Sequence, residues 1–203
     1  IMSSDWSSDV CSSDLGKMGR VEQLRNAPRP YWYQYIREVK EDDVDWPEFL
    51  FGLPMRPFDP VLCSGWYGYR DFSDGPIPGL ASHYVDLVNY ITGTKFPKSC
   101  VAMSNTYTWI DEHNFDAPDH VNAVWEYEDG FSSYYTTNFG NGSGNCMKFY
   151  GNKGVLDVSD WNNTYVSGEG AHGETDLPNE RTHIDNKERH KHMKDWLQSV
   201  SNP

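Results

Sequence analysis

The hydrophobic positions of this chain follow a helical spacing in one segment and an alternating spacing in several others. In residues 79–91 the apolar side chains recur at helical intervals, at Leu80, Tyr84, Leu87, Val88 and Ile91. Such positions form one apolar stripe on a helix, and a glycine just after the stripe, here Gly93, is typical of a helix end. The pattern therefore predicts a helix over residues 79–91 that packs along one face.

From Ser99 onward, apolar and polar residues alternate. The alternating segments are bounded by glycine, asparagine, aspartate or proline, and they are 100–109, 121–129, 131–139, 146–152 and 154–160. Alternation indicates strands with one buried face, and Asp129-Gly130 is a strong signal for a hairpin. We predict an antiparallel meander whose second face is solvated or covered by a partner. A shorter alternating strand is predicted within residues 16–27.

The rest of the chain has weaker patterns. Residues 31–39 are rich in aromatic side chains, and the acidic run 41–45 is expected to be a solvated loop. A short helix is predicted at 46–51, whereas the prolines between residues 54 and 62 exclude regular structure there. A second amphipathic helix is predicted at 189–200. Together these elements predict an α+β fold, a mostly antiparallel open sheet with a few helices on one face.

Charge and composition narrow the range of functions. The 203 residues include 17 lysines and arginines against 30 aspartates and glutamates, a formal net charge of -13. That sign is unfavourable for nucleic acid or an anionic membrane surface, so we expect neither as a partner and favour a small molecule. No run approaches the ~18 apolar residues of a membrane span, and no secretory leader is visible, which favours a cytoplasmic over a periplasmic location. The cysteines have no CxxC spacing, so no zinc or redox site is expected.

Residues 1–15 differ abruptly in composition from the rest of the chain. They consist largely of Ser-Ser-Asp units with neither helical nor strand periodicity. We interpret them as a non-native or disordered tail and exclude them from the fold. The α+β domain is therefore assigned to residues 16–203.

The best candidate for a pocket is the segment that leads into the predicted helix. A loop rich in glycine, proline and aromatic residues, 65–78, is followed by His83 in the expected first helical turn. Free backbone N–H groups at a helix start favour anionic or hydroxyl-rich ligands, and an imidazole can accept or release a proton near neutral pH. His83 is therefore the candidate acid-base residue, and the same position also suits a purely structural histidine.

Two other patterns carry less weight. The glycine-rich segment 140–145 lies between two strand patterns with no helix after it, so a turn is predicted rather than a phosphate-binding loop. His190 and His192 are two residues apart and would face different sides of a helix. No metal site is therefore predicted from them or from His172 and His183.

Seven segments occur in an order that is familiar from one enzyme family. They are GKMGRVEQL (16–24), VDWPEFLFG (44–52), GLASHYVDLVNYITG (79–93), FPKSCVAM (96–103), YEDGF (127–131), FYGNKGVLDV (149–158) and HMKDWLQSVSNP (192–203). Together they resemble the C-terminal domain of the Gfo/Idh/MocA family, which includes glucose-fructose oxidoreductase and inositol dehydrogenase. The resemblance covers nearly all of residues 16–203.

Members of that family join an N-terminal Rossmann domain, which binds NAD or NADP, to a C-terminal domain with a large, mostly antiparallel sheet. The resemblance therefore implies NAD or NADP as cofactor, no Rossmann domain and no cofactor-binding residue in this chain, and a chain truncated at both ends. It also implies a carbohydrate substrate and a homo-oligomer formed through the sheet face.

The resemblance implies roles for individual residues. His83 matches the family's catalytic histidine and Asp86 a later aspartate, but Gly79 stands where the family has a further aspartate. His83 would then work with a different acid, such as Asp74, or the chain would support different chemistry.

Two residues of the preceding loop complete the predicted site. Trp66 is expected to stack on a sugar face, and Arg70 to donate paired hydrogen bonds to a polyol. The predicted substrate-binding residues are thus Trp66, Arg70, Asp74 and Asp86.

Three functions are consistent with these features. The first is an NAD(P)-dependent oxidoreductase acting on a sugar or cyclitol hydroxyl, of which this chain would be the substrate-binding half, inactive alone. The second is an NAD-dependent glycosidase of the same family, in which transient oxidation labilises a glycosidic bond. The third is a non-catalytic module that only oligomerises or binds a ligand.

Overall fold

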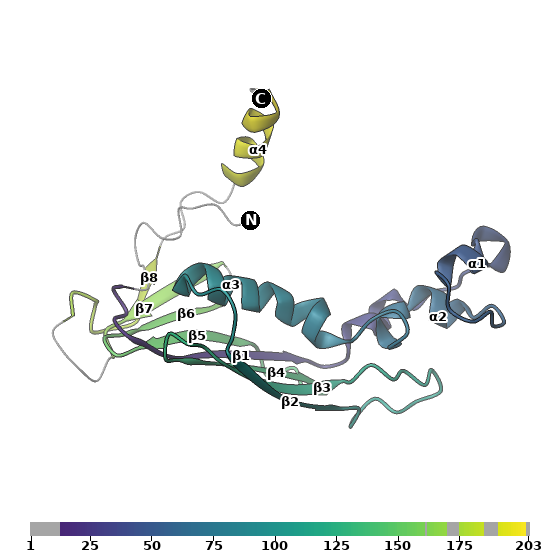
Figure 1. Ribbon diagram of the computed structural model, residues 1–203, viewed down its shortest axis with the longest axis horizontal. Helices are drawn as coiled ribbons and strands as arrows, with labels where there is room; N and C mark the ends of the chain where they lie inside the picture. Colours follow the sequence, from purple (N-terminus) through teal and green to yellow (C-terminus); the bar gives the residue numbers. More distant parts are fainter. Residues whose placement is uncertain (1–12, 161, 170–174, 185–190, 202–203) are drawn as a thin grey trace.

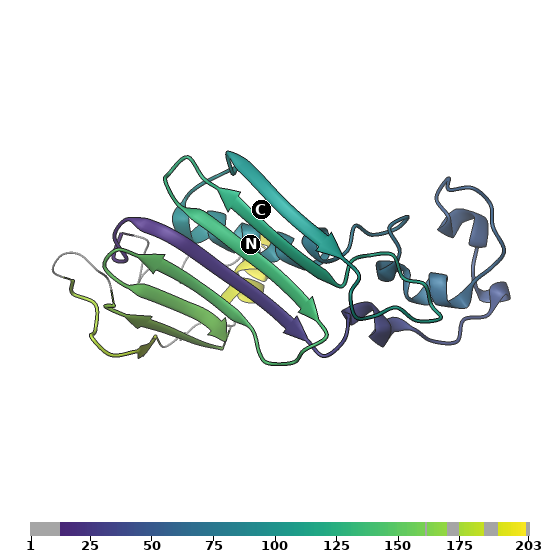
Figure 2. The same ribbon diagram turned by 90° about the horizontal axis from the view of Figure 1, so that it is seen from below.

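A sheet of eight strands is the centre of the fold in the residues that the computed structural model describes, which are 13–160, 162–169, 175–184 and 191–201. Its strand order is β2-β3-β4-β1-β5-β6-β7-β8 (Figure 1 and Figure 2). The strands are β1 (Met18–Ala27), β2 (Ser99–Asn105), β3 (His120–Glu126), β4 (Ser132–Phe139), β5 (Cys146–Gly151), β6 (Val155–Asp160), β7 (Asn163–Ser167) and β8 (Thr182–Ile184).

Helices lie over one face of the sheet and beyond one of its ends. In the described ranges they are α1 (Trp46–Phe49), α2 (Pro60–Ser64), α3 (Ser82–Thr92) and α4 (Lys191–Ser201), with the short helical turns η2 (Tyr31–Tyr35), η3 (Glu41–Asp43), η4 (Trp66–Gly68) and η5 (Ile77–Ala81). The turn η5 runs directly into α3, which crosses one face of the sheet, and the other face carries no helix from this part of the chain (Figure 2). The predicted fold class is confirmed.

The strand order corrects the predicted meander at one place. β1 lies between β4 and β5, parallel to β4, with Val21 opposite Ser133, and antiparallel to β5. The segment 140–145, the predicted turn, crosses the end of β1 to connect them, and the Asn26 side chain donates to Ser143 Oγ (3.0 Å) and to the Gly144 carbonyl (2.9 Å). Alternation along a strand shows which face is buried but not which strand lies beside it, so the sequence pattern could not place β1.

The core lies between this sheet and α3. Alternate residues of the central strands point toward the helix and are fully buried, as Val21, Tyr135 and Phe149 are. From the helix, Ala81 and Val88 meet them, and both are 0% exposed. Burying one large apolar side chain of this kind contributes roughly 1.5–3 kcal/mol. The helix ends as predicted at Gly93, whose φ of 73° is the left-handed conformation that glycine adopts without strain.

Residues 28–75 and 106–119 form a lobe beyond the end of the sheet (Figure 1). Two small apolar clusters hold it. One centres on Trp32, Phe115 and Phe139, and the other on Trp46 and Leu62. The lobe therefore has its own core, built mainly from aromatic rings.

The lobe corrects the expectation that residues 54–62 have no regular structure. The helix α2 begins at Pro60, because proline lacks only an N–H that the first helical position leaves unused. The Asp59 carboxylate accepts hydrogen bonds from the backbone N–H groups of Val61 (2.8 Å) and Leu62 (3.1 Å) and so caps the helix. The acidic run 41–45, expected as a loop, contains the exposed turn η3.

Residues 1–12 of the predicted tail lie outside the described residues. Leu15 does not behave as part of such a tail, because it is fully buried in the core of the sheet and its carbonyl accepts a hydrogen bond from the Lys153 N–H. The predicted C-terminal helix is present as α4, and in its described part Trp196, Leu197 and Val200 are exposed. In the described ranges, every helix is too short or too polar to cross a membrane.

Candidate functional site

The helix that carries His83 starts with a widened turn. Within η5 the hydrogen bond from the Ser82 N–H reaches back to the Ile77 carbonyl, five residues earlier. Single turns of this π-helical kind are frequent at functional sites. Because η5 runs directly into α3, the helix starts at Ile77 and His83 does not lie in its first turn. The free backbone N–H groups expected beside His83 are therefore not there. That part of the prediction was wrong.

His83 and Asp86 lie on the face of α3 that points away from the sheet. Both are exposed, whereas Ala81 and Val88 on the opposite face are buried. Residues three apart on a helix share one face. An imidazole and a carboxylate are therefore presented together on the free side of the helix.

Trp66 belongs to an aromatic cluster formed by Tyr31, Tyr35, Trp66 and Tyr67. The Trp66 and Tyr67 rings are stacked, with centroids 3.7 Å apart. The Tyr67 ring also contacts the rings of Tyr35 at 5.5 Å and Tyr31 at 5.4 Å. The cluster joins η2 to η4, and since Tyr35 is 43% exposed, part of its aromatic surface is accessible to solvent.

Tyr31 connects this cluster to the helix. A Cβ atom added at Gly79 would overlap the Tyr31 hydroxyl, so this glycine is what lets the phenol approach the helix backbone. The Tyr31 Oη is covered by protein and has no hydrogen-bond partner in the described residues. Burial, together with the neighbouring Tyr67 and Tyr35, raises the pKa of Tyr31 to about 12. The phenol is therefore protonated and neutral at pH 7.

Arg70 and Asp74 lie on the exposed loop between the cluster and the helix. The Arg70 backbone N–H donates to Asp116 Oδ1 (2.7 Å), and its Nε–H donates to the Asp116 carbonyl (2.9 Å). Arg70 thus fastens the two segments of the lobe together. Asp74 precedes Gly75, whose φ of 80° turns the chain toward the helix. Among the predicted loop residues, Trp66 is linked to the helix through the rings of Tyr67 and Tyr31, whereas Arg70 bonds Asp116.

A row of buried polar side chains lies beneath α3. Gln23 of β1 and Ser133, Tyr135 and Thr137 of β4 all occupy the helix-facing side of the sheet and are at most 2% exposed. Gln23 Oε1 and the hydroxyl oxygens of the other three have no hydrogen-bond partner among the described residues. Buried polar atoms are nearly always paired, so this row is unlike an ordinary core. The sequence pattern could not show it, because serine, threonine and tyrosine also suit a solvated strand face.

A second histidine, which no sequence pattern indicated, has a structural role. The buried Asp119 carboxylate bonds His120 Nδ1 (2.6 Å), and His120 Nε2 bonds Asn138 Oδ1 (2.8 Å). Asp119 also accepts from three backbone N–H groups, those of Tyr107, Thr108 and Trp109. Burial alone would raise the pKa of Asp119, but these hydrogen bonds hold it below its usual value. Both ring nitrogens are occupied, so His120 anchors the lobe.

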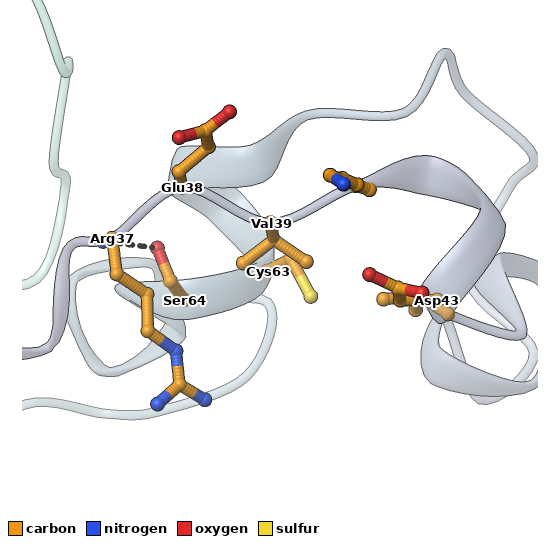
Figure 3. A pocket seen from close by; sticks show the side chains of 8 residues that line it. Arg37, Glu38, Val39, Asp43, Cys63 and Ser64 are labelled. Atoms are coloured by element: carbon orange, nitrogen blue, oxygen red, sulfur yellow. Dashed lines mark hydrogen bonds between the residues drawn. The ribbon is translucent and has the colours of Figure 1, made fainter.

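A hollow of about 620 Å³ lies elsewhere in the lobe (Figure 3). Its lining includes Arg37, Glu38, Asp43 and Cys63, and none of the predicted site residues. Burial raises the pKa of the Cys63 thiol, with Arg37 opposing it, and a protonated thiol is a poor nucleophile. The hollow therefore carries no evident chemistry.

The chain does not supply the elements of a dinucleotide site in its described residues. The glycine-rich segment 140–145 joins β4 to β5 rather than a strand to a helix, so it lacks the helix start that would hold a pyrophosphate. In the described ranges no three histidine, cysteine, aspartate or glutamate side chains could hold a metal ion together. Of the histidines considered as metal ligands from the sequence, His172 and His190 lie outside the described residues.

These features define an α+β domain that presents an exposed imidazole on a helix packed against an open sheet. The model of the GFO/IDH/MocA C-terminal domain matches residues 53–157. The chain belongs to this family, as the resemblance implied. No curated protein matches the chain.

Solved structures share the fold at low sequence identity. An oxidoreductase from Thermotoga maritima has a TM-score of 0.56 at 13% identity and covers 92% of this chain and 44% of its own. An NAD binding oxidoreductase from Klebsiella pneumoniae has a TM-score of 0.52 at 13% identity, with coverages of 85% and 40%. Levoglucosan dehydrogenase, in complex with NADH and L-sorbose, has a TM-score of 0.52 at 10% identity, with coverages of 85% and 40%. This chain therefore spans less than half the length of these proteins.

Proposed function

We propose that this chain is the substrate-binding part of an NAD(P)-dependent oxidoreductase that acts on a sugar or cyclitol hydroxyl. The observation that carries the proposal is the exposed pair His83 and Asp86 on the free face of α3. Family membership supports the reaction class, and the L-sorbose complex of levoglucosan dehydrogenase supports the substrate class. The domain would extend over residues 16–203 and take its cofactor from a separate domain.

In this proposal His83 exchanges a proton with the substrate hydroxyl. Imidazole suits that role because its ordinary pKa lies near neutrality. Asp86 shares its helix face and supplies the nearby negative charge. Trp66, stacked on Tyr67, presents an aromatic face on which a sugar ring can lie. The oxidation itself is the chemistry of a nicotinamide, which the separate domain would hold.

The test joins this chain to a nicotinamide-binding domain of the family and measures NADH formation on a panel of polyols. We expect His83→Ala to lower kcat by about 10²–10⁴-fold, the usual contribution of one acid-base group. Because His83 is exposed, the same change should alter the free energy of unfolding by no more than ~0.5 kcal/mol. His183→Ala is the matched control, since this histidine is also exposed but lies on the edge strand β8. Equal activity in the His83 variant and the wild type would remove His83 from the mechanism.

The same assay separates the alternatives. Release of sugar from a glycoside without net NADH formation would favour an NAD-dependent glycosidase. Absence of any sugar-dependent change in Trp66 fluorescence, measured against a Trp66→Phe variant, would favour a non-catalytic module. Loss of sugar binding in Trp66→Phe with an intact fold would support the stacking role.

The open face of the sheet supports a second copy of this chain as a partner. Val101, Val124 and Tyr134 lie opposite one another across β2, β3 and β4 on the face without helices. Val101 and Met103 are 72% and 70% exposed, an unusual amount for a paired strand. Light scattering should therefore report a dimer, and Val101→Glu with Met103→Glu should give a monomer with unchanged circular dichroism. A wild-type monomer would exclude this interface.

A further inference from the structure

An arginine of the central strand lies on the side of the sheet that α3 covers. Side chains alternate along β1, and Val21 and Gln23, which point toward the helix, are 0% and 1% exposed. Arg25 is the next residue of this series, and it pairs with Thr137 of β4, which also points toward the helix. Arg25 is half-buried. A charged side chain therefore begins where the strand pattern would place an apolar one.

The Arg25 guanidinium has no ion-pair or hydrogen-bond partner among the described residues, although the chain contains 30 acidic residues. Three other arginines each have a carboxylate oxygen within 3.3 Å, and they are Arg20, Arg56 and Arg181. A guanidinium carries five N–H donors and no acceptor. Because a partly buried charge without a partner is unfavourable, the position of Arg25 requires an explanation.

Two tyrosines lie near this guanidinium where α3 packs against β1. Burial raises the pKa of Tyr84 on α3 and of Tyr135 on β4, and the positive charge of Arg25 opposes the rise in both. The two rings contact each other at a centroid distance of 5.9 Å. Both phenols are neutral at pH 7, so neither of them compensates the charge of Arg25.

We propose that Arg25 binds the anionic group of a small ligand, a carboxylate or a phosphate, at the flank of α3. A planar guanidinium can donate two parallel hydrogen bonds to two oxygens of such a group. The hydroxyl oxygens of Tyr135 and Thr137 are covered by protein, so the guanidinium alone makes the polar contact. The net charge of -13 repels anions from most of the surface, and a half-buried cation therefore selects where an anion binds.

The anion site lies next to the proposed reaction site on the same helix. Tyr84 directly follows His83, and neighbouring side chains of a helix point about 100° apart around its axis. A ligand held by Arg25 beside Tyr84 can thus extend around the helix toward His83. This narrows the proposed substrate to a sugar acid or a sugar phosphate. That step rests on the proposed function, whereas the binding of an anion does not.

The first test observes the guanidinium in the wild-type chain. The nitrogen-15 resonance of Arg25 Nε, assigned with an Arg25→Lys variant, is followed while D-gluconate or inorganic phosphate is added at constant ionic strength. At least one of the two anions should shift it saturably and so identify the group that binds, and the neutral D-glucitol should not. Arg29, which is exposed, is the internal control and should not respond. No saturable shift with either anion, or an equal shift of Arg29, would overturn the proposal.

The second test separates a ligand-binding arginine from a structural one. In a buffer free of phosphate and carboxylates, Arg25→Met should unfold at the wild-type temperature or up to roughly 3 °C above it. Methionine keeps the apolar stem and removes the unpaired charge. The binding anion should raise the unfolding temperature of the wild type and of the Arg29→Met control, because it binds only the folded chain.

In Arg25→Met this response should be lost, with a dissociation constant at least about tenfold higher, since charge-assisted hydrogen bonds are the strong ones. A lower unfolding temperature of Arg25→Met in the absence of anions would assign Arg25 a structural role. An unchanged response to the anion in this variant would exclude it as the binding site. Either result overturns the proposal.

Neither test uses a nicotinamide, so the anion site and the proposed function can fail separately. Anion binding at Arg25 without NADH formation in the joined enzyme would refute the proposed function alone. Oxidation of neutral polyols by an enzyme whose Arg25 binds no anion would refute the anion site alone.

Discussion

The sheet and the lobe are stabilised by different interactions. In the sheet, regular backbone pairing aligns rows of apolar side chains against α3, so stability is spread over many similar contacts. In the lobe, short turns are joined by a few specific bonds, such as Tyr33 Oη to Asp111 Oδ2 (2.5 Å) and Tyr69 Oη to the His113 carbonyl (2.8 Å). The side chains proposed to recognise ligand lie where the two regions meet. A rigid sheet thus supports an irregular region whose geometry depends on single side chains.

The largest expected effect is in the sheet. Phe149→Ala should reduce the free energy of unfolding by about 3–5 kcal/mol, because the ring is fully buried and its removal leaves a cavity. Urea titration followed by circular dichroism measures this loss. Lys148→Ala is the control from the neighbouring position, whose side chain points to the other face and pairs only loosely with Asp157 at 3.7 Å. A loss below ~1 kcal/mol for Phe149→Ala would mean that the sheet core is not where stability is concentrated.

The next largest effect is in the lobe, at one carboxylate. Asp119→Ala removes the acceptor of three backbone N–H groups and of His120, and should cost roughly 3 kcal/mol. Asp119→Asn keeps one acceptor oxygen and should cost less. Hydrogen exchange at Thr108 and Trp109 reports the lobe, and exchange at Val124 reports the sheet. If Asp119→Ala accelerates exchange equally at all three amides, the two regions unfold as one unit and are not stabilised separately.

A smaller effect is expected from acid titration of two carboxylates, the buried Asp119 and the half-buried Asp157. The pKa values of Asp119 and Asp157 are both lowered. For Asp157, burial opposes the shift, whereas hydrogen bonds from Ser159 and the charges of Lys148 and Arg181 produce it. A group whose folded pKa is depressed binds fewer protons when folded. Its contribution to stability is therefore complete above the unfolded pKa near 3.9 and is lost as pH falls through the folded pKa.

Thermal unfolding between pH 7 and pH 2 measures this loss. We expect the unfolding temperature to decrease once the pH is below 4. Asp119→Asn should reduce the difference between the unfolding temperatures at neutral and acid pH. Asp157→Asn, on β6, should reduce this difference through the sheet without affecting amide exchange in the lobe. An acid sensitivity that is unchanged in both variants would assign it to other carboxylates.

The sheet could be predicted from the sequence more completely than the candidate site, for a physical reason. Alternation in 121–160 and the helical stripe in 79–91 are local patterns, and they predicted strands, a hairpin at Gly130 and the helix end at Gly93. The contact between Tyr31 and Gly79 joins residues 48 positions apart, and no periodicity encodes it. The sequence showed the aromatic run that contains Tyr31, but it did not show that Tyr31 contacts Gly79. Asp119 is likewise one of 30 acidic residues, and only the fold shows that it is buried.

The smallest expected effect concerns an ion pair on the surface of the lobe. Arg56 donates to Asp71 Oδ2 at 2.7 Å, and its guanidinium lies 5.7 Å from the Phe72 ring centroid. The two side chains are 35% and 53% exposed, so water and salt screen the pair, and Asp71→Ala should cost only about 0.2–1 kcal/mol.

Arg56→Ala should cost slightly more, because it also removes the contact with Phe72. A double-mutant cycle in low and high salt isolates the pair itself, and we expect its coupling energy to decrease in high salt. A coupling energy above ~2 kcal/mol would mean that exposed charges, rather than aromatic packing and buried acceptors, hold the lobe together.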